Sequence, residues 1–345
     1  MKKIIILLLS IIAIFSLVSC SGKDESSSNI SEDESKGKIL VYLSGPEEML
    51  NKLETLYEKD NGDVLDFNIL SCGQLRSKTW AESEAGKINA DVIWGSDPLL
   101  YNKLDEENLL MPLTLKEEDN LQDRFLLSDK NYTYVNERYI IIMYNNTLLS
   151  ENIPTSYSDL TNDCYKNKIT MADSNLSSTA FAIAASLYQM TGNNDSYFKE
   201  LANNNLSLAK SNGLVPSKIM EGEFSVGIAP HDAVVRLQNK AKKEGYSIPL
   251  DMVWPSEGAI AIQRPVAITK NTDRTEQQQK TATSFIDFLQ SKEAQSITNQ
   301  FGFVSVRKDI ENNYLVNNAT SYDINWEECT CKETEIKDAF TNIFH

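Results

Sequence analysis

Three strand–loop–helix units follow one another near the start of this 345-residue chain, and their order is the feature that most constrains its fold. Short apolar runs typical of buried strands alternate with stretches in which apolar side chains recur at helical spacing. The strand patterns cover residues 38–43, 64–70 and 90–94, and the helical patterns cover residues 47–59, 75–85 and 98–104. Consecutive units of this kind build a parallel sheet with helices on its faces, so the chain is predicted to be an α/β protein.

The loops of these units are the first candidate ligand contacts. Parallel sheets bind ligands in the crevice outside the carboxyl ends of their strands. Each predicted strand is followed there by small and polar residues, namely Ser44 and Gly45, then Ser71 and Gly73, then Ser96. Such residues also make ordinary turns, so their predicted convergence is what makes them candidates.

A second half of the chain repeats the α/β pattern. Strands are expected at residues 139–144, 168–172, 224–229 and 260–268, and helices at residues 180–190, 233–244, 277–289 and 292–301. Ser177, Ser178 and Thr179 lie where one of these helices begins, so hydroxyls, backbone N–H groups and the positive end of the helix dipole favour an anion there. An ordinary helix cap is the alternative interpretation.

The first 37 residues are predicted to lie outside the folded part. Residues 1–19 have the lysines and the apolar run of a signal peptide, and Leu17 to Cys20 resemble a bacterial lipoprotein box. We expect Cys20 to be lipidated and to hold the protein at the outer face of the cytoplasmic membrane. The mature chain then has 345 − 19 = 326 residues and a net charge of −16 − 2 = −18. Residues 20–37, with Ile30 as their single apolar residue after Cys20, are predicted to be a flexible tether.

Composition excludes several classes of function. Asp and Glu outnumber Lys and Arg by 49 to 33, which argues against a nucleic-acid partner because phosphate backbones require clustered cations. The chain contains two histidines and neither a Gly-x-Ser-x-Gly nor a Gly-x-x-x-x-Gly-Lys-Ser/Thr motif. Cys72, Cys164, Cys329 and Cys331 are too few for a disulfide-built scaffold of this size. We therefore expect no enzymatic activity, no cofactor and no bound metal.

Several segments in this order resemble the type II periplasmic binding proteins of ABC importers, in the branch that holds ferric-ion, phosphonate and hexose-phosphate binders. The segments are residues 90–94, 143–147, 154–160, 221–228, 255–258 and 284–295. The resemblance covers residue 38 to the C-terminus. It implies a monomer that delivers a small ligand to an ABC permease in the membrane.

The resemblance also implies a two-lobed fold that closes over its ligand like a hinge. Each lobe is expected to be a mostly parallel sheet flanked by helices, and two crossover strands near residues 136–144 and 259–268 join the lobes. Lobe 1 is predicted to comprise residues 38–136 plus about 266–295, and lobe 2 residues 137–265. The C-terminal helices, in residues 296–345, are expected to pack back across both lobes.

Within this branch the hexose-phosphate binders are the nearest match. Ferric binders usually present two adjacent tyrosines, and none of the 14 tyrosines here is followed by another. His231, Asp232 and Glu257 resemble the sugar-contacting residues of hexose-phosphate binders. Arg138 and Arg264 lie near the crossovers and are either phosphate ligands or members of structural ion pairs. The alternatives are a phosphonate or another organophosphate, ferric ion, and a role as the ligand-sensing input to a membrane kinase.

Overall fold

The computed structural model describes residues 37–312 and 320–345. The predicted signal peptide, Cys20 and the predicted tether up to residue 36 lie outside the described residues. None of the described helices is long and apolar enough to cross a membrane. The described cysteines, Cys72, Cys164, Cys329 and Cys331, are free.

One mixed sheet runs through the molecule, with the strand order β2-β1-β3-β9-β4-β7-β5-β6. Its strands are β1 (Ile39–Leu43), β2 (Leu65–Ile69), β3 (Val92–Trp94), β4 (Thr133–Tyr144), β5 (Ile169–Ala172), β6 (Ser207–Ala209), β7 (Val226–Pro230) and β9 (Ala259–Ile268). Strands β2, β1 and β3 are parallel to one another, as are β6, β5 and β7. The sheet therefore consists of two parallel parts, one at each end.

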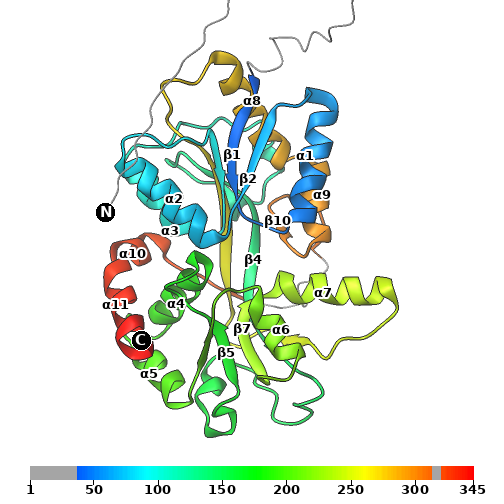
Figure 1. The fold of residues 1–345 in the computed structure, drawn as a ribbon, viewed down its shortest axis with the longest axis vertical. Coiled ribbons are helices and arrows are strands. Elements are labelled where there is room, and N and C mark those ends of the chain that lie inside the picture. The colour runs from blue at the N-terminus through cyan, green and yellow to red at the C-terminus, as the bar shows by residue number, and fades with distance from the viewer. Residues whose placement is uncertain (1–36, 313–319) are drawn as a thin grey trace, which may run out of the picture.

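The long antiparallel pair of β4 and β9 joins these two parts. Thr133 of β4 lies opposite Val266, and Ile140 lies opposite Ile260. The later half of β4 pairs with β7, and the later half of β9 pairs with β3. These strands span both lobes and are the two crossovers expected from the sequence (Figure 1). Short strands extend the pair: β8 (Asp251–Val253) and β10 (Val304–Ser305) pair with β4, and β11 (Ser321–Tyr322) pairs with β9.

Lobe 1 is built on the β2-β1-β3 part of the sheet. Its helices are α1 (Glu47–Asn61), α2 (Cys72–Glu84), α3 (Pro98–Glu106), α8 (Glu276–Leu289) and α9 (Lys292–Gln300). Because strand side chains alternate between faces, Val41 packs with Leu53 and Phe285 on one face, and Tyr42 packs with Leu75 on the other. Each parallel strand leads through a loop into a helix, so the loops meet at the lower edge of this lobe (Figure 1).

Lobe 2 is built in the same way on β7, β5 and β6. Its helices are α4 (Ser178–Met190), α5 (Ser196–Asn203), α6 (Leu214–Met220) and α7 (His231–Glu244). Helix α4 is buried along most of its length and packs with Ile142 and Ile228 of the sheet. Short 3₁₀-helices occupy connecting segments: η2 (Glu118–Asn120), η3 (Asp123–Phe125), η4 (Ser158–Thr161) and η5 (Asp163–Tyr165).

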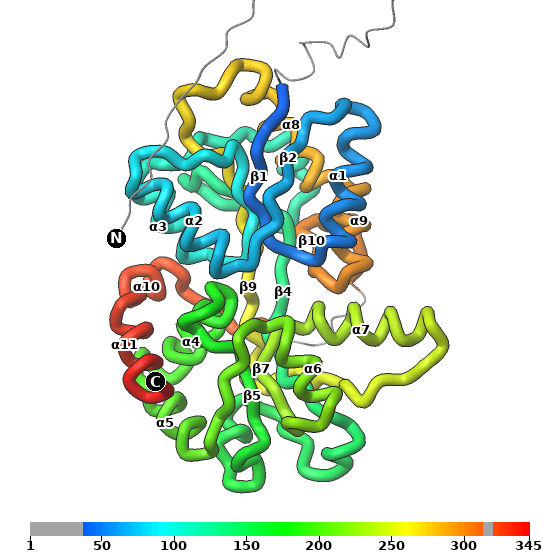
Figure 2. The backbone as a smooth tube through the Cα atoms, in the orientation of Figure 1, coloured from blue at the N-terminus to red at the C-terminus, as the bar shows by residue number. Residues whose placement is uncertain are grey.

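The last two helices follow a path of their own on one side of the molecule. Helix α10 (Trp326–Cys331) packs against α3 of lobe 1, and α11 (Glu333–Phe344) packs against α4 and α5 of lobe 2. Figure 2 shows this C-terminal segment passing from just below α3 down beside α4. The C-terminus therefore contacts both lobes.

Candidate functional site: the cleft between the lobes

A polar cleft of about 420 Å³ lies between the two lobes where the strand-end loops meet. Lobe 1 contributes the loops after β1, β2 and β3, and lobe 2 contributes the segments before α4, α6 and α7. Its lining includes most of the residues that the sequence predicts for the site: Ser44, Gly45, Ser71, Gly73, Ser96, Ser177, Thr179 and Asp232. The structure thus brings together residues that are up to 188 positions apart in the chain.

Helices α1, α2, α4 and α7 all begin at this cleft. Pro46, Ser71, Ser177 and Pro230 are the residues that precede their first turns, and all of them line it. The first N–H groups of a helix have no partner within the helix, and the helix dipole places partial positive charge at this end. The convergence of such ends favours an anionic ligand.

Charged side chains in the cleft strengthen this preference. Among the described residues that line it, the charged ones are Arg138, Lys210, Arg236 and Asp232, which gives 3 − 1 = +2. The whole chain carries −16. Only local charges act strongly on a ligand, because salt screens exposed charges beyond about 8 Å. The cleft is therefore locally cationic in an acidic protein.

The carboxylate of Asp232 is already bound by two arginines. The Nε and Nη2 atoms of Arg138 lie 3.3 Å from its two oxygens, and Nη1 of Arg236 lies 3.5 Å from Oδ2. Burial opposes ionisation of Asp232, but the charges of Arg138 and Arg236 outweigh it, so the pKa of this carboxyl lies below its ordinary value. Asp232 is ionised and orients two cationic side chains.

Arg264 supports the cleft from behind without lining it. Its side chain is fully buried between the rings of Trp94 and Phe303, at 4.7 and 4.6 Å from their centroids. Its Nε donates to Ser96 Oγ at 2.8 Å, and its Nη2 donates to the carbonyl oxygen of Ser44. Burial, reinforced by the nearby charge of Arg138, lowers the pKa of Arg264 to about 9. Arg264 thus lies behind the lining of the cleft, and its hydrogen bonds run to neutral groups rather than to the carboxylate of an ion pair.

The two lobes touch beside the cleft. Thr179 Oγ1 of lobe 2 donates to the carbonyl oxygen of Ser96 in lobe 1 at 3.3 Å. Gly73 lies so close to Leu176 that an added Cβ would be 2.7 Å from the Leu176 carbonyl oxygen. Glycine at position 73 therefore permits this approach of the lobes.

Three predicted site residues do not line the cleft. His231 is completely buried; its Nδ1 accepts from the backbone N–H of Tyr139 at 3.0 Å, and its ring packs against Trp254. Burial lowers the pKa of His231 to about 4, so the imidazole is neutral. Proline at position 230 precedes the first turn of α7, and this places Asp232 in the cleft and His231 in the core.

Glu257 is an exposed residue with a local structural role. Its carboxylate accepts from the backbone N–H groups of Tyr157 at 3.2 Å and Ser158 at 3.0 Å, at the start of η4. Helix α4 begins at Ser178, two residues earlier than expected. Successive side chains of a helix point in different directions, and that of Ser178 faces away from the cleft. Glu257, His231 and Ser178 thus lie outside the lining of this cleft.

Other lining residues were not anticipated. Lys210, Ser211 and Asn212 follow β6, whose three residues carry no recognisable strand pattern. Arg236 had a usable signal, since it lies four residues after Asp232 and therefore on the same face of α7.

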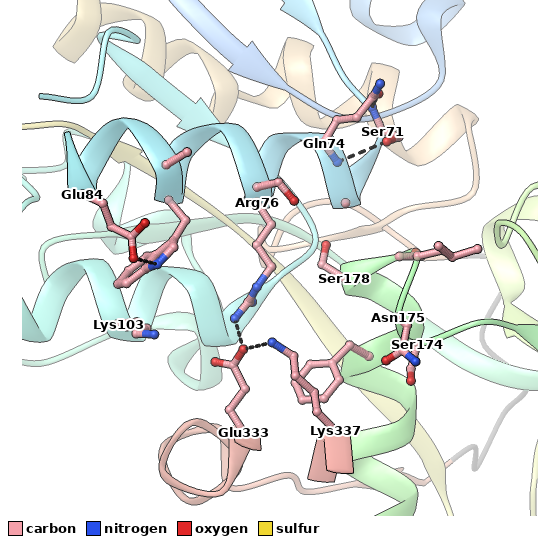
Figure 3. A pocket seen from close by; sticks show the side chains of 17 residues that line it. Ser71, Gln74, Arg76, Glu84, Lys103, Ser174, Asn175, Ser178, Glu333 and Lys337 are labelled. Carbon is pink, nitrogen blue, oxygen red and sulfur yellow. Dashed lines mark hydrogen bonds and ion pairs between the residues drawn. The ribbon is translucent and has the colours of Figure 1, made fainter. Parts of the chain in front are cut away.

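A second cavity of about 810 Å³ lies across the Gly73–Leu176 contact, between α2, α4 and α11 (Figure 3). The charged side chains that line it are Arg76, Lys103, Lys337, Glu84 and Glu333, which gives 3 − 2 = +1. Glu333 binds Arg76 at 2.6 Å and also binds Lys337. Ser178 faces this cavity. The cleft carries the larger net positive charge, +2 against +1, so it is the better candidate for an anionic ligand although it is smaller.

A metal site is not evident in the parts of the chain that the structure describes. These contain no cluster of three or more His, Cys, Asp or Glu side chains placed to hold an ion. No tyrosine is among the described residues that line the cleft.

Two lobes joined by crossover strands around a polar cleft define the class of hinged solute-binding proteins. Residues 87–330, more than half of the chain, match the sequence model of the bacterial extracellular solute-binding proteins, and the chain belongs to this family. It is an extracellular solute-binding protein of the ABC-transporter type, and its place of action is outside the cytoplasm.

Individual relatives are more distant. An uncharacterized protein of Haemophilus influenzae is 28% identical over 276 residues, which is 76% of this chain and 75% of that protein. A Salmonella typhimurium protein named "Putative 2-aminoethylphosphonate-binding periplasmic protein" is 24% identical over 232 residues, and the match covers 64% of each chain. The fold is similar to that of the periplasmic binding protein AfuA from Actinobacillus pleuropneumoniae with fructose-6-phosphate bound. The TM-score is 0.75 at 23% identity, over 89% of this chain and 97% of that one.

Proposed function

We propose that this protein captures a sugar phosphate, specifically a hexose phosphate, in the cleft between its lobes and delivers it to an ABC permease. The observation that carries the proposal is the cationic cleft at which α1, α2, α4 and α7 begin. A phosphate ester is a small dianion whose oxygens accept hydrogen bonds from N–H groups and arginines. Arg138, Arg236 and Lys210 are the side chains that we assign to the phosphate.

The remainder of the cleft favours a neutral, hydroxyl-bearing group next to the phosphate. Ser44, Ser71, Ser96, Ser211 and Asn212 offer donors and acceptors that match sugar hydroxyls. A sugar ring therefore finds partners without the burial of a new charge.

A phosphonate is the principal alternative, and the Salmonella relative is named for one. 2-Aminoethylphosphonate carries an ammonium group, which requires a carboxylate or several carbonyl acceptors when it is enclosed. Asp232 is the one carboxylate among the described lining residues, and it is bound by Arg138 and Arg236. This pairing favours a hexose phosphate over an aminoalkyl phosphonate.

Ferric ion is the weaker alternative. A hard trivalent cation requires several anionic oxygen ligands, whereas the described part of the cleft offers a net charge of +2 and a single carboxylate that is already paired. A synergistic anion would be needed to make iron binding favourable here.

Attachment through lipidated Cys20 is part of the proposal. The test is metabolic labelling with a radioactive fatty acid, which should label the wild-type protein and leave Cys20→Ser unlabelled. Equal labelling of both proteins would contradict the assignment.

The ligand assignment is tested by calorimetry on the protein from Ser21 onward with fructose 6-phosphate, glucose 6-phosphate, inorganic phosphate, 2-aminoethylphosphonate and ferric citrate. A hexose phosphate should bind most tightly and should raise the melting temperature, because it binds only the folded state. Arg236→Gln should weaken binding about tenfold or more, since it removes a charge-assisted contact. Lys240→Gln, an exposed residue one turn further along α7, is the matched control. Tighter binding of the phosphonate or of iron would refute the sugar assignment and keep the family.

A further inference from the structure

The last two helices of the chain form a bridge between the lobes. We call residues 326–344, which form α10 and α11, the C-terminal strap. Its first helix contacts both lobes. On lobe 1, Glu327 pairs with Lys130 at 2.9 Å, and Thr330 accepts from Asn102 Nδ2 at 3.4 Å. On lobe 2, Glu328 accepts from Gln189 at 3.1 Å and from Asn193 at 2.8 Å. The family match ends at residue 330, so α11 lies beyond it.

The second helix of the strap is anchored on lobe 2. Phe340 is completely buried and packs against Phe198 of α5, with ring centroids 5.5 Å apart. The hydroxyl of Tyr188 in α4 donates to Glu335 at 2.6 Å. Apolar burial of this kind gives α11 a firm attachment, so it is expected to move with lobe 2.

One ion pair connects this helix to lobe 1 next to the cleft. Arg76, in α2, donates through Nη2 to Glu333 Oε1 at 2.6 Å and through Nη1 to both oxygens of Asp97 at 2.8 and 2.7 Å. Lys337 binds the same Glu333 oxygen from one turn further along α11 (Figure 3). The side chains of Arg76 and Glu333 are 17% and 14% exposed, so water screens their interaction only partly.

These charged groups are directly linked to the candidate site. Asp97 is the N-cap of α3 and follows the cleft residue Ser96, whereas Arg76 lies one turn after Gly73 on α2. Burial raises the pKa of the Glu333 carboxyl, but the charges of Arg76 and Lys337 outweigh it, so the net shift is downward and Glu333 is ionised. Rotation of one lobe away from the other must pull Arg76 and Glu333 apart, because they are attached to different lobes.

We propose that the Arg76–Glu333 ion pair is an interlobe latch that stabilises the closed cleft and slows the release of the ligand. The effect on the ligand rests on the proposed function, whereas the effect on lobe closure does not. Both residues are positioning residues: neither lines the cleft, and they act through the separation of the lobes.

The test uses Glu333→Gln in the protein from Ser21 onward, which retains every residue that the structure describes. Arg76 keeps its two contacts with Asp97 in this variant, so folding should be preserved. The matched control is Glu335→Gln, which changes the same residue type on the same helix but loses only a contact within lobe 2. Small-angle X-ray scattering of the ligand-free proteins reports lobe separation, and stopped-flow tryptophan fluorescence reports the dissociation rate of fructose 6-phosphate.

Glu333→Gln is expected to increase the radius of gyration of the ligand-free protein and to speed dissociation about fivefold, as for the loss of a partly exposed ion pair. Glu335→Gln should change neither quantity, and 1 M salt should bring the wild-type rate toward that of Glu333→Gln. Unchanged scattering and kinetics in Glu333→Gln would overturn the latch, as would equal changes in both variants. If none of the tested ligands binds, the proposed function fails, and the scattering comparison still decides whether the latch exists.

Discussion

The contact between Gly73 and Leu176 gives the sharpest prediction. Gly73 belongs to α2 of lobe 1, and Leu176 belongs to the loop before α4 of lobe 2. A Cβ at position 73 would lie 2.7 Å from the Leu176 carbonyl oxygen and 3.5 Å from its carbonyl carbon. Ordinary contact begins near 3.4 Å, so Gly73→Ala requires a local separation of 3.4 − 2.7 = 0.7 Å. The opposing atoms are backbone and cannot rotate out of the way.

Gly73→Ala is expected to destabilise the closed form of the protein, in which the two lobes are in contact. Overpacking by a methyl group costs about 1–3 kcal/mol in a close-packed contact. Because the clash exists only when the lobes meet, we expect the affinity for hexose phosphate to fall about 5- to 150-fold. The ligand-free protein can open slightly, and alanine is favoured over glycine within a helix by roughly 1 kcal/mol. The melting temperature of the ligand-free variant should therefore stay the same or rise, although its affinity for hexose phosphate falls.

Calorimetry and thermal denaturation of Gly73→Ala measure the two effects separately. Gly95→Ala is the matched control, because it also lies at the strand-end loops of lobe 1. Its added Cβ would meet side chains of lobe 1, namely Leu75 at 3.4 Å and Ser44 at 3.7 Å. Wild-type affinity in Gly73→Ala would refute the argument that ligand binding requires this lobe contact. A large fall in its ligand-free melting temperature would show that the clash is not relieved by opening.

Other predictions concern single residues. Because the pKa of His231 is about 4 in the folded protein and about 6.5 when unfolded, the unfolded state binds the extra proton. The free energy of unfolding should therefore fall by roughly 3 kcal/mol as the pH drops from 7 to 4. Urea titrations of His231→Gln should lack this component, and an identical pH dependence would contradict it. Glu257→Gln should lower the free energy of unfolding by about 1 kcal/mol through its lost contact with Tyr157 and leave ligand affinity unchanged; a tenfold loss of affinity would return Glu257 to the site. Arg138→Gln should weaken phosphate binding about tenfold or more, by calorimetry, because it also releases Asp232; unchanged binding would move the site elsewhere.

Regular elements with strong periodicity were predictable from the sequence. The opening strand and helix units and the crossover strands β4 and β9 lie within a few residues of the expected positions. Alternating or continuous apolar runs indicate which side chains are buried, so they predict strands and helices from a single sequence. Elements α5, β6 and α6 were not predicted, because they are short and β6 has only three residues.

Helix starts decided which predicted site residues reach the cleft. Helices α4 and α7 each begin two residues earlier than the apolar pattern indicated, at Ser178 and His231. Successive side chains of a helix are rotated by about 100°, so neighbouring residues face different surroundings. Asp232 therefore lines the cleft and His231 does not, although both were equal candidates by sequence.

The sequence by itself determined the alternation of strands and helices. It thereby also determined at which edge of each parallel part of the sheet the polar loops lie. This followed because the period of apolar residues and the right-handed connection of parallel strands are local rules. Only the tertiary structure decided that Lys210 and Arg236 face the same cleft as Ser44, that Arg264 supports the cleft from the core, and that Glu333 meets Arg76. These contacts join residues more than a hundred positions apart in most cases, and no local pattern encodes which distant charges become neighbours once the two lobes have folded and met.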